Sequence, residues 1–330
     1  MTVTIDDIRA AAARLDGFAA RTPLLESPRL NERLGGRLLV KAECLQKTGS
    51  FKFRGAFNTL SSMDPEIRAR GVLAYSSGNH AQGVALSARM FGIPATIIMP
   101  ADAPDLKKRN TAEYGAEVIL YDRFGENREA LGERLVAERG LTLVKPYDQE
   151  SVIAGQGTVG LEIGEQAEQL DARPEIALCP AGGGGLISGA SVALKDAFPD
   201  IAVHPVEPAG FDDWRRSLDS GERQSADPAA RSICDAILTP TPGEITFAIG
   251  RRTLSEGLSV TDAEALAAMR TAFLELKIVT EPGGVVALAA VLSGRIDLAG
   301  RTAVVIVSGG NVDPALFRRA LEENAAATAA

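Results

Sequence analysis

The 330-residue chain has few cysteines, few aromatic residues and no excess of positive charge. Its three cysteines, Cys44, Cys179 and Cys234, are odd in number, widely separated and form no CxxC pair, so we expect neither a disulfide framework nor a structural zinc site. Lys and Arg number 35 against 43 Asp and Glu, which gives a net charge of −8 with no polybasic run. Nucleic acid and anionic membranes are therefore poor candidate partners.

Long apolar runs are also missing. The longest ones, such as 285–292 and 303–307, are far shorter than the roughly 18 residues that suggest a membrane span. The first residues, MTVTIDDIRA, lack the basic start and apolar core of a signal peptide, so we expect a cytosolic protein. A content of 45% hydrophobic residues is typical of a soluble globular protein, and the length predicts two domains.

Short apolar segments alternate with helical periods along most of the chain. Strands are predicted at 37–43, 72–75, 95–99, 117–121, 142–144, 176–179, 202–207 and 303–307. Helices are predicted at 4–15, 50–60, 81–91, 105–114, 126–139, 157–169, 185–196, 262–276 and 284–292. Between 210 and 229 the apolar period fails, and we expect irregular surface there. Two series of alternating strands and helices predict two α/β domains with parallel sheets.

Glycine is abundant, with 33 residues, and its densest run is 182–185. This run follows a predicted strand and precedes a predicted helix, where consecutive backbone N–H groups form a cradle suited to a phosphate. The alternative is a tight turn that needs positive φ, but four glycines in a row exceed that need. The chain has no GxGxxG in a first βα turn and no GxxxxGK[ST], so neither the dinucleotide fingerprint nor the P-loop is present.

A second candidate is Lys52, which stands between Phe51 and Phe53 with Arg54 close by. Apolar surroundings and a neighbouring cation both lower the pKa of an ammonium group, which makes a lysine nucleophilic or able to form a Schiff base. The alternative is a surface lysine that extends its charged end into solvent.

Two polar segments follow predicted strands. Ser77, Gly78, Asn79 and His80 open a helix after the strand at 72–75, and this set of groups suits a carboxylate. An ordinary helix N-cap is the alternative. Ser308 follows the strand at 303–307, at the strand end where ligands of parallel α/β sheets gather.

Together these segments resemble the fold-type II pyridoxal-phosphate enzymes, and among them the threonine/serine dehydratase and serine racemase family. The motifs SFKFRG, SSGNH, GGGG and SGGN occur in the family's order, as do APDLKK at 103–108 and IAGQGT at 153–158. The resemblance covers 22–312. It implies the α/β architecture of tryptophan synthase beta, with two doubly wound domains of parallel or mixed sheet. A large domain, 1–70 and 147–330, would bind the cofactor, and a small domain, 71–146, would close over the substrate, with no C-terminal regulatory domain.

The resemblance also implies roles for single residues. Lys52 would bind pyridoxal 5′-phosphate covalently and accept a proton, Phe51 would pack on its ring, and Ser308 would face its ring nitrogen. Asn79 would bond the phenolic oxygen. The phosphate would be held by Gly182, Gly183, Gly184, Gly185 and Leu186, and the α-carboxylate of the substrate by Ser77, Gly78, Asn79 and His80.

Further implied roles concern a second proton donor, a metal and the far end of the substrate. Ser77 is the type of residue that serves as the opposite acid/base in racemases. Glu207, the carbonyl of Phe211 and Asp213 would bind Mg²⁺, Mn²⁺ or Ca²⁺, unless they form only an acidic surface turn. Arg128 would pair with a second carboxylate, unless it lies on a helix exterior.

The implied activity is that of a lyase. It would eliminate water from a β-hydroxy amino acid, by default L-threonine or L-serine, and release a 2-oxo acid and ammonia. The alternatives are a 3-hydroxyaspartate dehydratase and a serine racemase with side dehydratase activity. Departures from the family's pattern at 234–236, 239–242 and 281–284 border the expected site and leave the substrate open. A nicotinamide oxidoreductase and a binding module without catalysis are weaker alternatives. The family also implies a homodimer or homotetramer.

Overall fold

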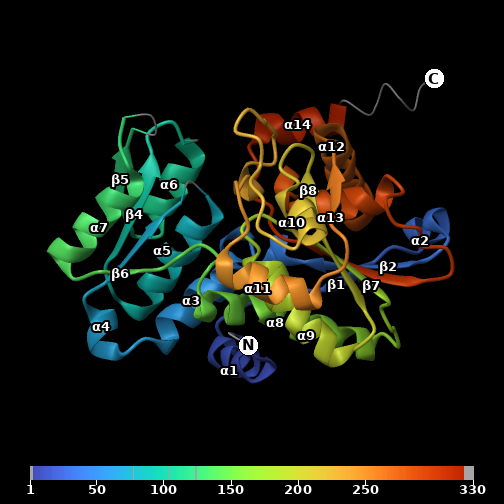
Figure 1. The fold of residues 1–330 in the computed structure, drawn as a ribbon, viewed down its shortest axis with the longest axis horizontal. Coiled ribbons are helices and arrows are strands. Elements are labelled where there is room, and N and C mark those ends of the chain that lie inside the picture. Colours follow the sequence, from blue (N-terminus) through green and yellow to red (C-terminus); the bar gives the residue numbers. More distant parts are fainter. Residues whose placement is uncertain (1–2, 77, 104, 123–124, 323–330) are drawn as a thin grey trace.

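The computed structural model describes residues 3–76, 78–103, 105–122 and 125–322, and its strands form two sheets (Figure 1). The larger sheet has six strands in the order β1-β2-β10-β7-β8-β9, and every neighbouring pair is parallel except β1 and β2. Its strands are β1 (Leu24–Glu26), β2 (Arg37–Ala42), β7 (Ile176–Pro180), β8 (Ala202–Pro208), β9 (Leu258–Val260) and β10 (Thr302–Val307).

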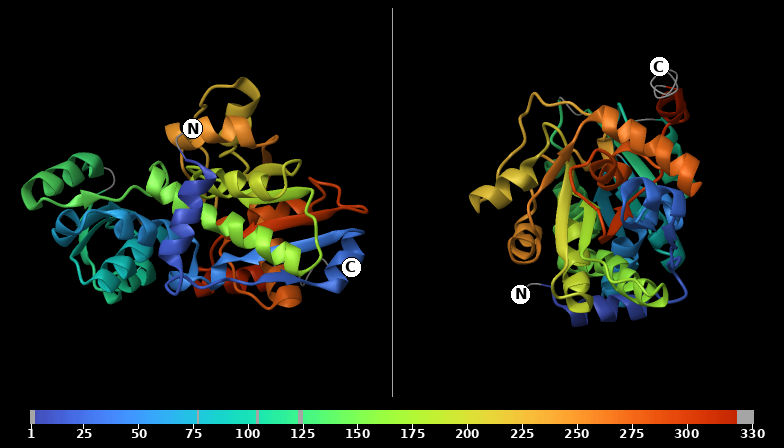
Figure 2. Two further views of the ribbon diagram at one scale, coloured as in Figure 1. Left: turned by 90° about the horizontal axis from the view of Figure 1, so that it is seen from below. Right: turned by 90° about the vertical axis from the view of Figure 1, so that its right-hand side faces the viewer.

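The smaller sheet has four parallel strands in the order β5-β4-β3-β6. They are β3 (Val72–Tyr75), β4 (Ala95–Pro100), β5 (Glu117–Tyr121) and β6 (Thr142–Leu143). This sheet and its helices lie at one end of the molecule, on the left of Figure 1 and again on the left of the first view in Figure 2. The predicted fold class is confirmed. All four strands fall within 71–146, while the domain boundaries themselves stay a prediction.

Helices cover both sheets. The helices that precede β6 in the chain are α1 (Ile5–Leu15), α2 (Pro28–Leu34), α3 (Lys52–Ser62), α4 (Pro65–Ala69), α5 (Asn79–Phe91), α6 (Asp105–Glu113) and α7 (Arg128–Arg139). Those after it are α8 (Glu150–Gln169), α9 (Gly185–Ala197), α10 (Asp213–Ser220), α11 (Glu244–Thr253), α12 (Asp262–Thr271), α13 (Pro282–Leu292) and α14 (Pro314–Glu322). Short 3-10 turns at Glu43–Leu45, Lys47–Gly49 and Asp235–Ile237 and a π-helical segment at Ala272–Leu276 complete the described elements. No described helix is long and apolar enough to span a membrane.

The large sheet is buried on both faces, which explains its unbroken apolar strands. Successive side chains of β10 point to opposite faces. Val304 packs in a cluster with Ile163 of α8 and Leu194 of α9, whereas Val305 packs in a separate cluster with Val286 of α13. One layer of helices therefore covers each face, and the loops at the strand ends remain free to form a site.

The prediction of irregular surface at 210–229 is wrong for its first part, because α10 occupies Asp213–Ser220. This helix buries Trp214 and Ser217, one turn apart, and presents polar residues elsewhere. Its first N–H groups are capped from the end of the preceding strand: Trp214 N and Arg215 N donate to the two carboxylate oxygens of Glu207, at 3.0 and 3.2 Å. A cap from a residue that precedes the N-cap position is outside the usual N-cap pattern.

Other boundaries differ less. Helix α8 begins at Glu150 instead of 157, since its glycines serve close helix packing and weaken the apolar period. A Cβ on Gly155 would lie 2.7 Å from the carbonyl oxygen of Arg54 in α3. The short elements β1, α2, α4 and β9 and the helices α11 and α14 were not predicted. The remaining predicted strands and helices are confirmed to within about two residues, the usual uncertainty of helix and strand ends.

Candidate active site

A cavity of about 650 Å³ opens where the carboxyl ends of strands from both sheets face each other. Its walls include Tyr75 at the end of β3, Pro180 at the end of β7 and Ser308 just after β10. Ligands of parallel α/β sheets bind at this edge because the strand-to-helix loops converge there. Every site residue predicted above that is described lines this cavity, except the three residues of the expected metal site. Ser77 lies outside the described residues.

Lys52 is the first residue of α3, and its Nζ donates a 2.6 Å hydrogen bond to the carbonyl oxygen of Pro146. Burial lowers the pKa of Lys52 to about 8, although the charge of Glu281 opposes this. The ring centroid of Phe51 lies 5.1 Å from Nζ. At pH 7 about a tenth of this amine is therefore unprotonated, far more than for an ordinary lysine, and only an unprotonated amine attacks a carbonyl or accepts a proton.

The glycine loop, residues 182–185, connects β7 to α9. The carbonyl oxygens of Gly182 and Gly183 accept hydrogen bonds from Trp214 Nε1 at 2.6 Å and Thr246 Oγ1 at 2.7 Å, which fixes the direction of these peptides. Helix α9 has no side-chain cap, and no hydrogen-bond acceptor for the N–H groups of Gly182, Gly183 and Gly184 is present in the described part of the chain. Free N–H groups at a helix N-terminus bind anions.

Two features show why this loop needs glycine. Gly184 has φ +94°, a conformation that residues with a Cβ rarely adopt. A Cβ on Gly183 would lie 2.3 Å from Cγ of Tyr147, whose ring packs on the loop. The alternative of a simple tight turn explains only Gly184, because Gly183 is required by the close approach of Tyr147.

Asn79, the first residue of α5, is held on both sides of its amide. Its Nδ2 donates to Oε1 of Glu281 at 2.5 Å, and its Oδ1 accepts from Nδ2 of Asn311 at 2.8 Å. Burial raises the pKa of Glu281 to about 7, with the charge of Lys107 opposing the shift. The other oxygen, Oε2, is buried and has no hydrogen-bond partner among the described residues. Glu281 therefore holds a proton over part of the neutral range.

His80 follows Asn79 and is buried. Burial and the charge of Lys52 lower the pKa of His80 to about 3, so the ring is neutral. Nε2 lies 2.9 Å from the carbonyl oxygen of Val144, which accepts the ring proton from that nitrogen. His80 thus supplies no positive charge. An anionic ligand beside it would instead be attracted by the N-terminus of α5, where Gly78 has no side chain.

Ser308 is fixed through its backbone. Its N–H donates to the carbonyl oxygen of Gly284 at 3.0 Å, and its own carbonyl accepts from the N–H of Phe51 at 3.1 Å. These bonds place the segment that follows β10 beside the segment that carries Lys52. The hydroxyl belongs to the cavity wall, where it can donate to or accept from a ligand.

The wall contributed by the small sheet carries cations. Arg128, the first residue of α7, donates from Nε to Oε1 of Glu129 at 2.7 Å, and half of its side-chain surface is exposed. Lys107 of α6 forms an ion pair with Asp235, which belongs to the segment before α11. This pair joins the two sides of the cavity.

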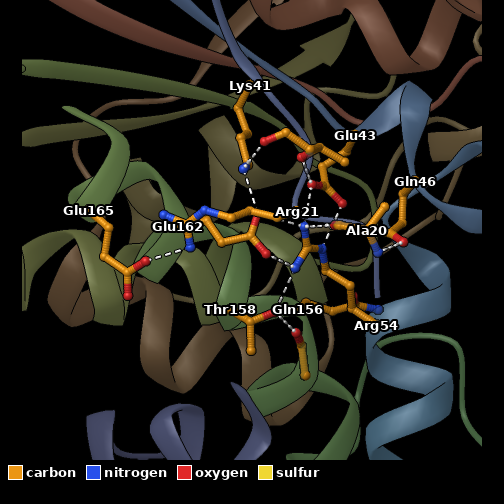
Figure 3. A network of polar contacts seen from close by, with 12 residues as sticks. Ala20, Arg21, Lys41, Glu43, Gln46, Arg54, Gln156, Thr158, Glu162 and Glu165 are labelled. Carbon is orange, nitrogen blue, oxygen red and sulfur yellow. Dashed lines mark hydrogen bonds and ion pairs between the residues drawn. The ribbon is translucent and has the colours of Figure 1, made fainter. Parts of the chain in front are cut away.

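A buried ion network holds the far side of α3 (Figure 3). Arg54 donates from Nε and Nη2 to the carboxylate of Glu43 at 2.8 and 2.7 Å, and from Nη1 to Oε1 of Glu162 at 2.6 Å. Lys41 Nζ lies 2.5 Å from Oε2 of Glu162. Two cations balance two carboxylates, and the network ties the helix that begins at Lys52 to β2 and to α8.

The predicted metal ligands lie outside the cavity. Glu207 and Asp213 are buried, and burial together with the charge of Asp213 raises the pKa of Glu207 well above its usual value. Oδ2 of Asp213 has no hydrogen-bond partner in the described chain, while both oxygens of Glu207 accept backbone N–H groups. Among the described residues no three His, Cys, Asp or Glu side chains gather closely enough to hold a metal, so a cation here would need backbone oxygens.

The family model for "Pyridoxal-phosphate dependent enzyme" matches residues 15–309. This chain is a pyridoxal-phosphate-dependent enzyme. It is 45% identical over 307 residues to an L-threo-3-hydroxyaspartate ammonia-lyase of Pseudomonas sp, covering 93% of this chain and 95% of the relative. It is 40% identical over 310 residues to a serine racemase of Schizosaccharomyces pombe, covering 94% of each chain. A solved structure of T.th. threonine deaminase matches with a TM-score of 0.88 and 43% identity, covering 94% of this chain and 99% of that chain. The predicted family is confirmed.

The residues present fit pyridoxal phosphate. The loop at 182–185 offers N–H groups without an acceptor to a phosphate, and Lys52 offers an amine with a lowered pKa to an aldehyde. Ser308 offers a hydroxyl to the ring nitrogen, and a hydroxyl there does not enforce a protonated ring. The roles assigned to single residues stay predictions.

Sequence reasoning missed three residues of the site: Tyr75, Tyr147 and Glu281. Tyr75 and Tyr147 have no local pattern that marks them, and Glu281 was noticed only as part of the segment 281–284 that borders the site. Glu281 bonds Asn79 across more than half the chain, and Tyr147 contacts the glycine loop. The available signal for Glu281 was a carboxyl residue immediately before Pro-Gly-Gly at the start of a strongly apolar helix.

Proposed function

We propose that this chain is a pyridoxal-phosphate-dependent ammonia-lyase that removes water from a β-hydroxy amino acid, with 3-hydroxyaspartate as its preferred substrate. The observation that carries the proposal is the cavity itself, which combines a lysine with a lowered pKa, an anion cradle and a guanidinium on the opposite wall. The likeness to the hydroxyaspartate ammonia-lyase of Pseudomonas sp supports the same substrate.

Bound pyridoxal phosphate supplies an aldehyde that takes up the substrate amine and a conjugated ring that withdraws electrons from the substrate's Cα. The chain supplies the rest. The N–H groups of the glycine loop would hold the phosphate, Asn79 would face the phenolic oxygen, and Phe51 would pack on the ring. The N-terminus of α5, with Gly78 and the neutral His80, receives the α-carboxylate.

Lys52 moves the proton. Its Nζ, held by the carbonyl of Pro146 and partly unprotonated at neutral pH, takes the proton from the substrate's Cα. The proton taken from Cα and the β-hydroxyl are lost together as one molecule of water, and the resulting enamine takes up water to give a 2-oxo acid and ammonia. For 3-hydroxyaspartate the oxo acid is oxaloacetate. Ser77 stays the candidate for a proton donor on the opposite face, which racemisation would require.

The second carboxylate of the substrate would face Arg128, which belongs to the cavity wall. A guanidinium binds a carboxylate through two parallel hydrogen bonds. Threonine has a methyl group and serine a hydrogen in the place of this carboxylate, and neither can form these bonds. L-threonine and L-serine, the default substrates of the sequence prediction, undergo the same elimination without this contact. They are the second candidates.

Three further properties are proposals of the same kind. A divalent cation at Glu207, Asp213 and the carbonyl of Phe211 would satisfy the unpartnered Oδ2 of Asp213. The small domain at 71–146 would move relative to the large one, 1–70 and 147–330, as substrate enters. A cytosolic homodimer or homotetramer stays the expectation for the assembly.

The test compares substrates on the holoenzyme. Release of ammonia and 2-oxo acid is measured over L-threonine, L-serine and the four stereoisomers of 3-hydroxyaspartate, with chiral analysis of the remaining amino acid. We expect the highest kcat/KM for one isomer of 3-hydroxyaspartate, and a loss of that preference in Arg128→Met. Equal or higher kcat/KM for threonine would contradict the substrate, and racemisation faster than ammonia release would contradict the reaction.

A further inference from the structure

One wall of the cavity contains a contact between an aromatic ring and a guanidinium. Tyr75 ends β3, Arg128 begins α7, and both line the cavity. Cζ of Arg128 lies 5.4 Å from the centroid of the Tyr75 ring, within the range of a cation–π interaction. The ring therefore limits where the guanidinium can lie.

A glycine makes room for this arrangement. Gly132 stands four residues after Arg128, one turn further along α7, and a Cβ there would lie 3.3 Å from Cε1 and 3.4 Å from Cδ1 of Tyr75. Residues four apart on a helix share one face, so Tyr75 covers the surface between Gly132 and Arg128. A Cβ at 132 would press on the ring, so the ring or the helix would have to shift.

The hydrogen bonds of Arg128 leave one edge of its guanidinium open. Nε donates to Glu129, whereas Nη1 and Nη2 have no hydrogen-bond partner within the described ranges. The ring of Tyr75 lies against the guanidinium, and Glu129 bonds Nε. Nη1 and Nη2 form the open edge, whose N–H groups can donate two hydrogen bonds to a carboxylate.

Two other cations of the cavity wall are occupied. Lys107 is paired with Asp235, and Arg223 donates to Glu244 at 2.8 Å and to the carbonyl oxygen of Pro242 at 3.3 Å. The charge of Arg128 also lowers the pKa of Tyr147, against the larger effects of burial and of Asp148, which raise it. Tyr147 packs on the glycine loop, so the charge of Arg128 is felt in the part of the cavity where the cofactor phosphate is expected.

We propose that Tyr75 is a specificity-determining positioning residue, which holds the guanidinium of Arg128 so that it receives the second carboxylate of a dicarboxylic amino acid. The space at Gly132 permits the ring position. This inference rests on the proposed function and deepens it, because it names the residue that converts an exposed arginine into a receptor for one substrate class.

The first test is a selectivity ratio, kcat/KM for 3-hydroxyaspartate divided by kcat/KM for L-threonine, measured on holoenzymes. A cation–π contact of ordinary strength predicts that Tyr75→Leu lowers this ratio by roughly fivefold to thirtyfold, mainly through KM for hydroxyaspartate. Tyr75→Phe keeps the ring and is the matched control, with a ratio within about twofold of wild type. Gly132→Ala, which displaces the ring, lowers the ratio in the same direction as Tyr75→Leu.

The second test does not depend on turnover. L-aspartate carries both carboxylates and L-2-aminobutyrate matches threonine in size, and neither has a β-hydroxyl to eliminate. Their dissociation constants are measured from the visible spectrum of the bound cofactor. Tyr75→Leu should weaken L-aspartate relative to L-2-aminobutyrate, whereas Tyr75→Phe should preserve the wild-type ratio.

The outcomes separate this inference from the proposed function. If wild type acts on hydroxyaspartate and Tyr75→Leu keeps both ratios within about twofold, Tyr75 has no positioning role while the proposed function stands. If Tyr75→Leu lowers binding of both ligands equally, its role is structural and the inference is overturned. If wild type releases no ammonia from hydroxyaspartate, the proposed function fails and the Tyr75 assignment fails with it.

Discussion

Asn79 Nδ2 donates a 2.5 Å hydrogen bond to Oε1 of Glu281, so a buried carboxyl group sets the orientation of the amide that faces the cofactor site. Asn311 completes the arrangement by donating to Oδ1 of Asn79 at 2.8 Å. The charges near Glu281 oppose each other: Lys107 and Lys52 lower its pKa, and Asp235 raises it. Burial prevails, and the carboxyl group is protonated more readily than one in solution.

Glu281 makes the stability of the cofactor-free protein depend on pH. Its pKa is about 7 in the folded chain against 4.5 for an ordinary glutamate, so the folded state binds the proton more tightly than the unfolded state. The contribution of Glu281 to stability is present below pH 4.5 and is lost as pH rises through about 7. Relative to Glu281→Gln, which cannot ionise, wild type should lose about 3 kcal/mol of unfolding free energy across this range. Urea unfolding of both proteins at several pH values measures the difference, and identical pH profiles would show that Glu281 is not perturbed.

The buried network of Figure 3 predicts a large loss of stability in Arg54→Met. Removal of the guanidinium leaves Glu43 buried without a cation and Glu162 with Lys41 alone, which costs about 3–5 kcal/mol. Arg21→Met is the matched control, because the Arg21–Glu165 pair lies beside the network but is about half exposed and contributes less than about 1 kcal/mol. Denaturant unfolding compares the two variants. Similar losses in both would contradict the assignment of Arg54 as the centre of the network.

The glycine loop predicts a steric effect on cofactor binding. In Gly183→Ala the new Cβ would lie 2.3 Å from Cγ of Tyr147, so the ring or the loop must move. We expect the affinity of the cofactor-free protein for pyridoxal phosphate to fall by about tenfold or more, measured by absorption titration. The double variant Gly183→Ala/Tyr147→Ala removes the clash and should recover part of the affinity. A single variant with wild-type affinity would refute the close approach as the reason for glycine.

The buried carboxylates Glu207 and Asp213 predict stabilisation by a divalent cation. A cation at one hundred times its dissociation constant would stabilise the folded protein by about 2.7 kcal/mol. The thermal midpoint of wild type should rise with added Mg²⁺, Mn²⁺ or Ca²⁺ and fall again with a chelator. Glu207→Gln should abolish the response, and Asp219→Asn, on the exposed side of α10, should retain it. A wild-type midpoint that none of the three cations changes would rule out the site.

The sequence predicts strands such as β4, β7, β8 and β10 well because they lie inside buried parallel sheets, where an apolar run bounded by turn residues is the expected pattern. The glycine loop and Lys52 can also be predicted from local sequence, because each stands at the end of a strand or helix in a segment of unusual composition. Helix α10 is hard to predict because it has 8 residues and buries only Asp213, Trp214 and Ser217, so its apolar period is weak. Tyr75 was missed because its importance comes from Arg128, which follows it by more than fifty residues. Contacts between distant segments leave no trace in a local pattern.

We propose that Lys52, in this cavity, drives the elimination of water from 3-hydroxyaspartate. The most direct test is ammonia and oxaloacetate release from L-threo-3-hydroxyaspartate by holoenzyme, compared between wild type and Lys52→Ala loaded with the same cofactor. We predict equal amounts of ammonia and oxaloacetate from wild type. Lys52→Ala should keep the fold, as judged by its circular dichroism, and lose activity by a factor of about a thousand or more. Wild type without ammonia release, or Lys52→Ala with wild-type turnover, would contradict the account.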